Sequence, residues 1–250
     1  MKLSIIIPVY NEEQTIGELV ERVRAVDIGD IEKEIIIAND GSSDRTRRVI
    51  DGSAWASDPR ITIHDNPVNF GKGAAVRVGL KYATGDIVLI QDADLELDPR
   101  EYGSLLEPLL DGRTDVVYGS RFLRRRSRLT FKARLGNRAL TWLTNILYGA
   151  RLTDMETAYK VFRREVLEGV RLRCVGFDFE PEITARLLRA GHRIVEVPVQ
   201  YNARRADEGK KIRWTDGVDA VYALLKCRFS RSRQGRSRQE VEREKLEVRS

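Results

Sequence analysis

Cysteine and histidine are both scarce in this chain, which has only two of each among its 250 residues. Cys174 and Cys227 lie far apart, so the sequence excludes a disulfide framework and a CxxC-type zinc site. His64 and His192 are too few for a histidine-rich metal centre and leave a Ser-His-Asp triad few candidates for its base. No G-x-S-x-G motif occurs either. These absences favour a reducing compartment and a chemistry carried by other residue types.

Long hydrophobic runs are also missing. The N-terminal "MKLSIIIPVYNEE" is apolar over too few residues for a signal peptide and is more typical of a buried strand. The apolar segment "ALTWLTNILYGA" at 139–150 is shorter than the roughly 20 residues that cross a bilayer. We therefore expect no signal peptide, no transmembrane helix and a cytoplasmic location.

The chain does have an excess of positive charge. Its 44 Lys and Arg exceed its 38 Asp and Glu, and the net charge of +6 indicates an anionic partner. Nucleic acid, phospholipid and phosphorylated small molecules are all such partners. A hydrophobic content of 42% is ordinary for a globular protein, and 250 residues suffice for one large domain or two small ones.

Short β-branched runs alternate with helical patterns in the first 120 residues. The runs are continuously hydrophobic, as expected for parallel strands covered on both faces, and lie at 3–9, 33–39, 60–64, 86–91 and 115–120. Asn11, with Gln14 three residues later, predicts the start of the first helix, and Asp98 followed by Pro99 predicts another helix start. This rhythm predicts a doubly wound α/β sheet.

The composition changes after residue 120. Residues 121–138 contain eight Lys or Arg and no acid, and they lead into the apolar segment 139–150. Such a segment can lie in a membrane interface, although a core-packing helix with a solvated charged face has the same composition. Further strands are expected at 157–162 and 193–199, and helices at 178–190 and 214–228. We expect one domain over 1–228, and a polar Arg/Ser-rich tail over 229–250 that could bind RNA or anionic lipid.

Polar side chains follow the predicted strands. Ligands of open α/β sheets bind beyond the carboxyl ends of the strands, so these side chains should share one crevice. They are Pro8, Tyr10 and Glu12 after the first strand, Asn39 and Asp40 after the second, and Asp92 and Asp94 after the fourth. Asp40 could accept hydrogen bonds from a base or ribose, or it could form an Asx turn in "NDGSSD".

The segment "IQDADLELDP" at 90–99 has an acid at every second position from Asp92. Magnesium ions typically take one or two carboxylates together with substrate phosphates, which suits Asp92 and Asp94 at a strand end. An EF-hand loop is excluded because Leu97 stands where its glycine is needed. A solvated strand end remains the alternative to a metal site.

A weaker signal lies in "GKGAAV" at 71–76. It lacks the third glycine of a dinucleotide-binding fingerprint, and the sequence has no P-loop motif. Lys72 could still bind phosphate at a helix N-terminus, although a surface lysine would fit the pattern equally well.

An ordered set of motifs now identifies a family. In sequence order they are "SIIIPVYNEEQTI", "IIIANDGSSDRT", "NFGKGAAVRVGL", "GDIVLIQDADLELDP", "VVYGSRF", "TDMETAYKVFRREVL", "GFDFEPEITARL" and "EGKKI". Together they resemble the family-2 nucleotide-sugar glycosyltransferases, in particular the branch of dolichyl- and polyprenyl-phosphate mannose and glucose synthases. The resemblance covers about residues 1–227.

The resemblance implies a Rossmann-like GT-A type fold and an inverting, metal-dependent transfer of a hexose from a UDP-glucose or GDP-mannose type of donor to polyprenyl phosphate. Residues 1–120 would bind the nucleotide sugar and 121–228 the acceptor. The chain would associate peripherally with the cytoplasmic face of a membrane and could have a membrane-protein partner there.

The resemblance also assigns roles to residues. Asp92 and Asp94 would hold Mg²⁺ or Mn²⁺, and Asp94, Arg121 and Lys211 would be catalytic. The residues that would bind the nucleotide sugar are Pro8, Tyr10, Glu12, Asp40, Lys72, Gln91 and Asp92. Those that would bind the acceptor phosphate are Arg121, Lys160, Arg204 and Lys211, with Glu180 and Glu182 as supporting carboxylates.

Two departures from the family pattern are present. Asn39 stands where an acid is common, which bears on base selectivity, and the Arg-rich tail replaces the transmembrane helices of many members. Two other functions stay open. A transferase acting on a soluble glycan or protein hydroxyl would need Glu182 as a base. Nucleic-acid binding fits the charge, but it does not explain carboxylates at strand ends, because these repel phosphates unless a cation intervenes.

Overall fold

The computed structural model describes residues 1–124, 130–202 and 214–230. It contains one seven-stranded sheet in the order β3-β2-β1-β4-β6-β5-β7. The strands are β1 (Lys2–Val9), β2 (Glu32–Asn39), β3 (Ile61–Asp65), β4 (Ile87–Ile90), β5 (Val116–Ser120), β6 (Lys160–Arg163) and β7 (Ile194–Pro198). All neighbours are parallel except β6, which is antiparallel to both β4 and β5.

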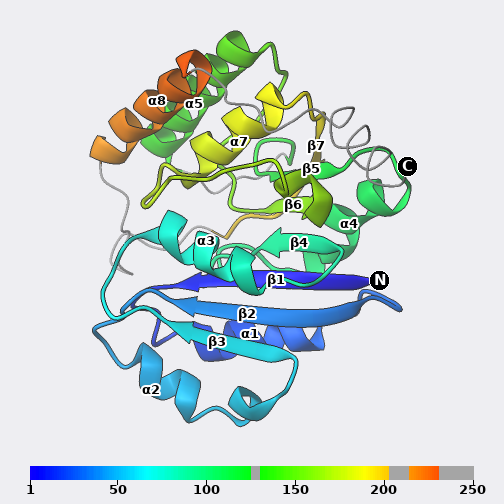
Figure 1. Ribbon diagram of the computed structural model, residues 1–250, viewed down its shortest axis with the longest axis vertical. Helices are drawn as coiled ribbons and strands as arrows, with labels where there is room; N and C mark the ends of the chain where they lie inside the picture. The colour runs from blue at the N-terminus through cyan, green and yellow to red at the C-terminus, as the bar shows by residue number, and fades with distance from the viewer. Residues whose placement is uncertain (125–129, 203–213, 231–250) are drawn as a thin grey trace, which may run out of the picture.

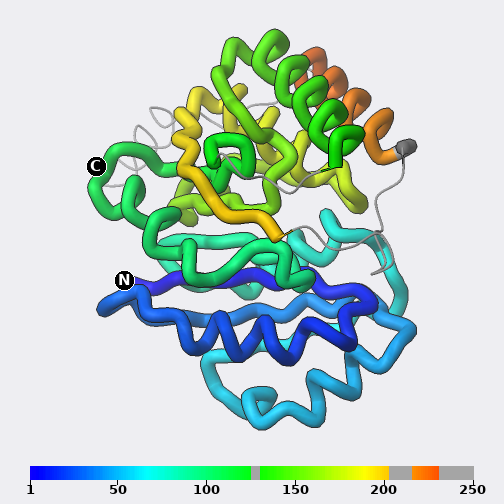
Figure 2. The backbone as a smooth tube through the Cα atoms, turned by 180° about the vertical axis from the view of Figure 1, so that it is seen from behind, coloured from blue at the N-terminus to red at the C-terminus, as the bar shows by residue number. Residues whose placement is uncertain are grey.

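The helices lie on both faces of this sheet (Figures 1 and 2). In chain order they are α1 (Ile16–Ala25), α2 (Thr46–Asp51), α3 (Lys72–Tyr82), α4 (Tyr102–Leu110), α5 (Phe131–Tyr148), α6 (Arg164–Leu167), α7 (Phe179–Arg189) and α8 (Trp214–Phe229), with 3₁₀ turns at Ala54–Ser57 and Pro99–Glu101. The predicted α/β fold with a central, mostly parallel sheet is therefore confirmed.

The two faces of the sheet bury separate clusters because successive strand residues point to opposite sides. Ile5 and Ile7 of β1 pack on the face covered by α1 and α4, whereas Ile6 packs on the face covered by α3 and α7. Both sides of each central strand are thus buried, and this is why the strands read as continuous hydrophobic runs. A third, smaller cluster joins α5, α7 and α8 beyond the sheet.

One predicted helix start is wrong and another is confirmed. Helix α1 begins at Ile16, so Asn11 is not its N-cap. Asn11 instead has a φ of 50° and accepts a hydrogen bond from the Ser43 backbone N at 2.8 Å, which ties the end of β1 to the loop after β2. Asp98 does cap the turn that precedes α4: its side chain accepts from the Arg100 N, with Pro99 at the first helical position.

Candidate functional site

The carboxyl ends of β1, β2, β4 and β5 meet at one edge of the sheet, and β6 begins there. Ile90 at the end of β4 pairs with Lys160, which also pairs with Tyr118 of β5. Segments far apart in the sequence thereby come together around Asp92. These are the strand ends at which the sequence predicted the site.

The acids of "IQDADLELDP" do not share a strand face. Strand β4 ends at Ile90, and Leu95 has a φ of 59°, so the chain turns back between Asp92 and Glu96. The backbone N of Glu96 donates to Asp94 Oδ1 at 3.1 Å, which orients that carboxylate within the turn. The regular spacing of the acids therefore belongs to a turn and not to one face of an extended strand.

Lys72 joins Asp92 to Glu180. Lys72 is the first residue of α3, and its Nζ lies 2.7 Å from Asp92 Oδ1, just after β4, and 2.7 Å from Glu180 Oε1, in the first turn of α7. Burial alone would lower the pKa of Lys72, but the two carboxylates outweigh it and raise the pKa above its usual value. Lys72 is therefore a fixed cation at this end of the sheet, and the surface-lysine alternative does not describe it.

Gln91 lies behind this group in the core. It is fully buried, and its Oε1 accepts from Tyr102 Oη at 2.9 Å and from Tyr159 Oη at 2.8 Å. Its Nε2 donates to the Asp92 carbonyl at 3.0 Å. The side chain of Gln91 therefore stabilises the backbone at Asp92 from within the core.

Asp40 holds a loop at the neighbouring strand end. Its carboxylate accepts from Asn66 Nδ2 at 2.8 Å, from the Phe70 N at 3.1 Å and from the Gly71 N at 2.6 Å. Asp40 is also only 2% exposed. These contacts fix the segment that leads into α3, and they therefore fix the position of Lys72.

The other predicted nucleotide-sugar residues follow β1. Pro8 is buried within the strand, opposite Ala38 of β2, and Tyr10 is half-buried just after it. Glu12 is 9% exposed and accepts from Thr15 Oγ1 at 2.8 Å. All three lie at the same sheet edge as Asp40 and Asp92.

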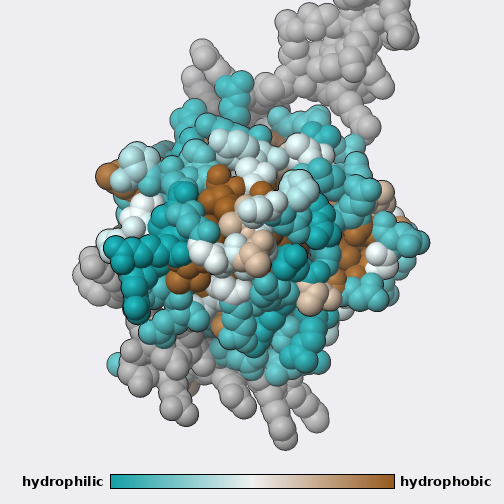
Figure 3. Space-filling model, turned by 90° about the horizontal axis from the view of Figure 1, so that it is seen from below, coloured by the Kyte–Doolittle hydropathy of each residue, from teal (hydrophilic) through white to brown (hydrophobic). Residues whose placement is uncertain are grey.

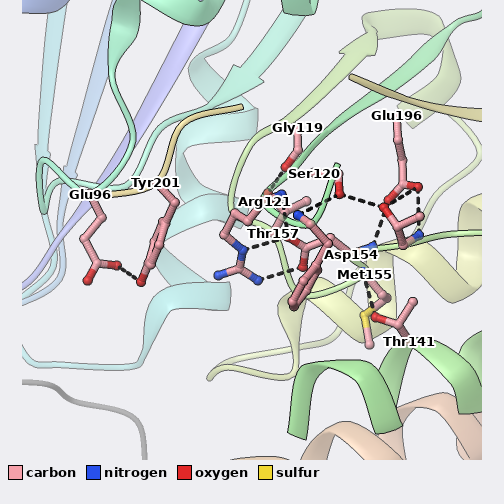
Figure 4. A network of polar contacts seen from close by, with 12 residues as sticks. Glu96, Gly119, Ser120, Arg121, Thr141, Asp154, Met155, Thr157, Glu196 and Tyr201 are labelled. Atoms are coloured by element: carbon pink, nitrogen blue, oxygen red, sulfur yellow. Dashed lines mark hydrogen bonds and ion pairs between the residues drawn. The ribbon is translucent and has the colours of Figure 1, made fainter. Parts of the chain in front are cut away.

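A buried ion pair stands at the end of β5 (Figure 4). Arg121 donates from Nε to Asp154 Oδ2 and from Nη2 to Asp154 Oδ1, both at 2.7 Å, and its backbone N donates to the same carboxylate. Burial opposes the charge on Arg121, but Asp154 reverses this effect and raises the pKa of the guanidinium. Glu196 of β7 in turn accepts from the Asp154 N at 2.9 Å. The contacts with Asp154 thus hold Arg121 in one orientation, and Glu196 of β7 in turn holds Asp154.

Tyr201 connects the Arg121 pair with the turn that contains Asp94 (Figure 4). Its ring centre lies 5.3 Å from the Arg121 guanidinium carbon, and its Oη donates to Glu96 Oε2 at 2.6 Å. The chain on either side of Tyr201 pairs with the same turn, through a bridge to Leu97 and an Asn202 N–H···O=C bond to Glu96 of 2.8 Å. Tyr201 therefore joins the two parts of the site, which are the Arg121–Asp154 ion pair and the turn that contains Asp94 and Glu96.

Two other predicted residues have contacts within the fold, and two lie outside the described residues. Lys160 is 0% exposed and donates from Nζ to the carbonyls of Met155 and Thr157, with the Tyr118 ring centre 4.3 Å away. Glu182 accepts from the Arg173 N and the Cys174 N and pairs with Arg186. Arg204 and Lys211, like the tail beyond Ser230, lie outside the described residues.

Sequence reasoning missed Asp154, Tyr201 and the role of Glu96. Asp154 lies inside the quoted motif "TDMETAYKVF", which was a usable signal. Its partner Arg121 is 33 residues away, however, and Tyr201 is 105 residues from Glu96. No local pattern predicts pairs at such separations.

The carboxylates present fit a metal shared with a ligand better than a metal held by protein alone. In the described part of the chain, no group of three or more His, Cys, Asp or Glu side chains is placed to hold a metal ion. Asp92 and Asp94 thus offer two hard oxygen donors, the number that Mg²⁺ commonly takes when phosphates complete its coordination.

Across residues 1–124, 130–202 and 214–230, no helix combines the length and hydrophobicity needed to cross a membrane.

Comparison with known proteins identifies relatives along most of the chain. The sequence model for glycosyl transferase family 2 matches residues 4–171. Dodecaprenyl-phosphate galacturonate synthase of Rhizobium johnstonii is 29% identical over 82% of this chain, and undecaprenyl-phosphate 4-deoxy-4-formamido-L-arabinose transferase of Proteus mirabilis is 28% identical over 90%. The chain spans 60% and 67% of the lengths of these two relatives.

Solved structures share the fold. Glucosyl-3-phosphoglycerate synthase from Mycobacterium tuberculosis, in complex with Mn²⁺, uridine diphosphate and phosphoglyceric acid, matches with a TM-score of 0.68 at 24% identity. The match covers 93% of this chain and 80% of that one. Another structure of the same enzyme contains Mg²⁺ and uridine diphosphate. The predicted GT-A type architecture is thereby confirmed.

Proposed function

The chain belongs to glycosyl transferase family 2, and we propose that it transfers a hexose from a nucleotide sugar to the phosphate of a polyprenyl or dolichyl phosphate, with inversion at the anomeric carbon. The observation that carries this proposal is the pairing of two features at one sheet edge. Asp92 and Asp94 lie in the turn after β4, and the preoriented Arg121 directly follows β5. The two polyprenyl-phosphate enzymes among the relatives support the same acceptor class.

The donor side of the reaction is assigned to Asp92 and Asp94. These carboxylates would hold Mg²⁺ or Mn²⁺ together with the donor diphosphate, and the bound ion would stabilise the charge that develops on the leaving group. Lys72 adds a cation within 3 Å of Asp92, held in place by Glu180. Asp40 would act indirectly, by fixing the loop that leads to Lys72.

The acceptor side is assigned to Arg121, with Arg204 and Lys211 as further cations. An acceptor phosphate oxygen is already anionic, so attack on the anomeric carbon needs no strong general base. What it needs is two anionic groups held close together in line, which fixed cations achieve. Arg121 meets this requirement because Asp154 and Tyr201 hold its guanidinium.

The carboxylates of α7 also favour a phosphate acceptor over a hydroxyl. A hydroxyl acceptor would need a base with a free lone pair facing the substrate. Glu182 is engaged by two backbone N–H groups and Arg186, and Glu180 is engaged by Lys72. Both are about 95% buried, so each serves better as a structural or positioning group than as a base.

A donor screen tests the proposal. The full chain would be incubated with UDP- and GDP-hexoses, Mn²⁺ and a short-chain polyprenyl phosphate in vesicles, and the lipid-linked sugar would be measured. We expect transfer from one class of donor, dependent on both the metal and the lipid phosphate. Transfer to a soluble hydroxyl acceptor with no transfer to lipid phosphate would contradict the proposal.

The exposed faces of α5 and α8 support the peripheral membrane association. Large apolar side chains recur at helical spacing on α5 and on α8, and the residues exposed by more than half are Phe131, Leu135, Trp142, Ile146, Val218, Tyr222 and Phe229. Lys132, Arg138, Lys226 and Arg228 are also exposed on these helices. Apolar and basic side chains together suit the surface of an anionic bilayer. The opposite end of the molecule, seen from below, is largely hydrophilic around smaller hydrophobic patches (Figure 3).

Replacing Trp142 with glutamate should weaken membrane binding. Trp142 is 66% exposed, so the change should leave the melting temperature nearly unaltered. Burial of a large apolar side chain is worth about 1.5–3 kcal/mol, so co-sedimentation with anionic vesicles should fall by about tenfold or more. Leu110→Glu on α4, at a side chain 47% exposed, is the matched control and should bind as the unmodified chain does. Equal binding by the two variants would contradict the assignment of α5 to the membrane.

Replacing Tyr201 with phenylalanine tests the link between the two parts of the site. The variant keeps the ring beside Arg121 but loses the hydrogen bond to Glu96, worth about 0.5–1.5 kcal/mol. We expect the KM for the nucleotide sugar to rise several-fold, because the Asp94 turn is less well held, with a smaller change in kcat. Tyr148→Phe removes a similar bond, to the Leu224 carbonyl, away from the site, and should leave KM unchanged. A rise in KM for both variants would indicate a general effect on stability.

A further inference from the structure

Glu156 has a buried carboxylate oxygen that the fold does not use. Its Oε1 is shielded from solvent and has no hydrogen-bond partner among the residues that the structure describes. Nearly all buried polar atoms in proteins are hydrogen-bonded, and leaving a charged one unpaired destabilises the fold. Such an atom indicates either a ligand or a functional constraint, because it contributes nothing to folding by itself.

The topology places Glu156 inside the proposed site. It lies four residues before Lys160, which begins β6 beside Ile90 at the end of β4. Lys160 donates to the carbonyls on both sides of Glu156, those of Met155 and Thr157, and so fixes this short segment from below. These two hydrogen bonds from Lys160 therefore fix the backbone on either side of Glu156 at this end of the sheet.

The charges around Glu156 come from both parts of the site. Burial raises the pKa of its carboxyl group to about 8, so the group is largely protonated at neutral pH. Glu180 and Asp154 contribute to this rise, whereas Lys160 and Arg121 oppose it. Glu180 belongs to the Lys72–Asp92 group, and Arg121 and Asp154 form the buried ion pair. Glu156 therefore lies near both the residues assigned to the donor diphosphate and those assigned to the acceptor phosphate.

In the proposed reaction, the sugar must lie between these two phosphates. We propose that Glu156 binds the transferred sugar and that its unpaired Oε1 accepts hydrogen bonds from the sugar's hydroxyl groups. This inference rests on the proposed function and adds a sugar class to it. Glu180 and Asp154, the acids that disfavour the charged form of Glu156, would also disfavour a sugar that carries its own carboxylate, so the preferred donor is a neutral hexose rather than a hexuronate.

Glu34 is a glutamate of the same chain whose carboxylate stabilises the fold through hydrogen bonds and an ion pair. Its carboxylate accepts from the Thr84 N at 2.6 Å and the Gly85 N at 3.0 Å, and it pairs with Lys2. Burial would raise its pKa, but these partners lower it to about 2. It belongs to the start of β2, at the edge of the sheet opposite the site. Glu34→Gln is therefore the matched control for Glu156→Gln.

The experiment compares the two variants in binding, transfer and stability. For Glu156→Gln we expect unchanged affinity for the nucleoside diphosphate alone. The affinity and kcat/KM for the neutral nucleotide hexose should fall by about 3- to 10-fold, since the amide offers one acceptor oxygen where the carboxyl group offers two. Its preference for a neutral hexose over a hexuronate should persist, because Glu180 and Asp154 remain, and its melting temperature should stay level or rise. Glu34→Gln should lower the melting temperature and leave the sugar affinity unchanged.

Opposite outcomes would overturn the inference. If Glu156→Gln keeps its sugar affinity, or loses stability as Glu34→Gln does without a change in sugar binding, Glu156 is a structural residue. Glu156→Asp gives a second variant that keeps the carboxyl group but withdraws it, and it should also lose sugar affinity. Because nucleotide-sugar binding is measured without an acceptor, a sugar effect without transfer to lipid phosphate would contradict the proposed function alone.

Discussion

Asp92→Asn should reduce sugar transfer by about three orders of magnitude or more. The amide removes one of two negative charges at the end of β4 and weakens an oxygen donor to the metal that stabilises the leaving diphosphate. The side chain keeps its size, and Lys72 keeps its second partner, Glu180, at 2.7 Å. The fold should therefore persist. Steady-state transfer assays over a range of Mn²⁺ concentrations, together with a melting curve, measure both expectations.

A remote aspartate provides the control for this experiment. Asp111 is exposed at the end of α4 and pairs with Arg113 at the surface. Asp111→Asn should transfer sugar at the unmodified rate. Asp94→Asn should resemble Asp92→Asn, because both carboxylates are assigned to the same ion. Full activity in either of these two variants would remove the metal assignment and with it the main support for a GT-A type mechanism here.

Asp154→Ala should cost about 3–5 kcal/mol of the free energy of unfolding, because it leaves Arg121 buried and without its counter-charge. Arg121 makes two side-chain bonds of 2.7 Å to this carboxylate, and Asp154 itself is 0% exposed. Transfer should fall as well, since Arg121 would lose the orientation on which acceptor binding depends. Chemical denaturation and steady-state kinetics measure the two effects separately.

Two further variants distinguish a specific loss from a general one. Asp51→Ala breaks the exposed pair with Arg47 on α2 and should change stability little. The double variant Arg121→Met/Asp154→Leu removes both charges, so it should regain much of the lost stability while remaining inactive. If the double variant transfers sugar normally, Arg121 does not bind the acceptor phosphate.

Sequence patterns were sufficient for the sheet because hydrophobic runs are a local signal. The central parts of β1, β2 and β4 are buried on both faces, which is why the runs "IIIPV", "IIIA" and "IVLI" are apolar throughout. The Asp98–Pro99 helix start was equally readable, since a cap acts within a few residues. The predicted helix start at Asn11 was wrong because a contact with Ser43, which is distant in sequence, sets the conformation of Asn11.

The sequence by itself determined the α/β fold class and the strand ends that carry polar residues, and it predicted the Asp92–Asp94 pair as the centre of the site. Only the tertiary structure decided how these residues are used. It brought Lys72 between Asp92 and Glu180, Arg121 onto Asp154, Tyr201 onto Glu96, and Lys160 beneath Glu156. The reason is physical: burial and hydrogen bonding depend on three-dimensional neighbours, and chain crossovers bring together residues that no local pattern relates.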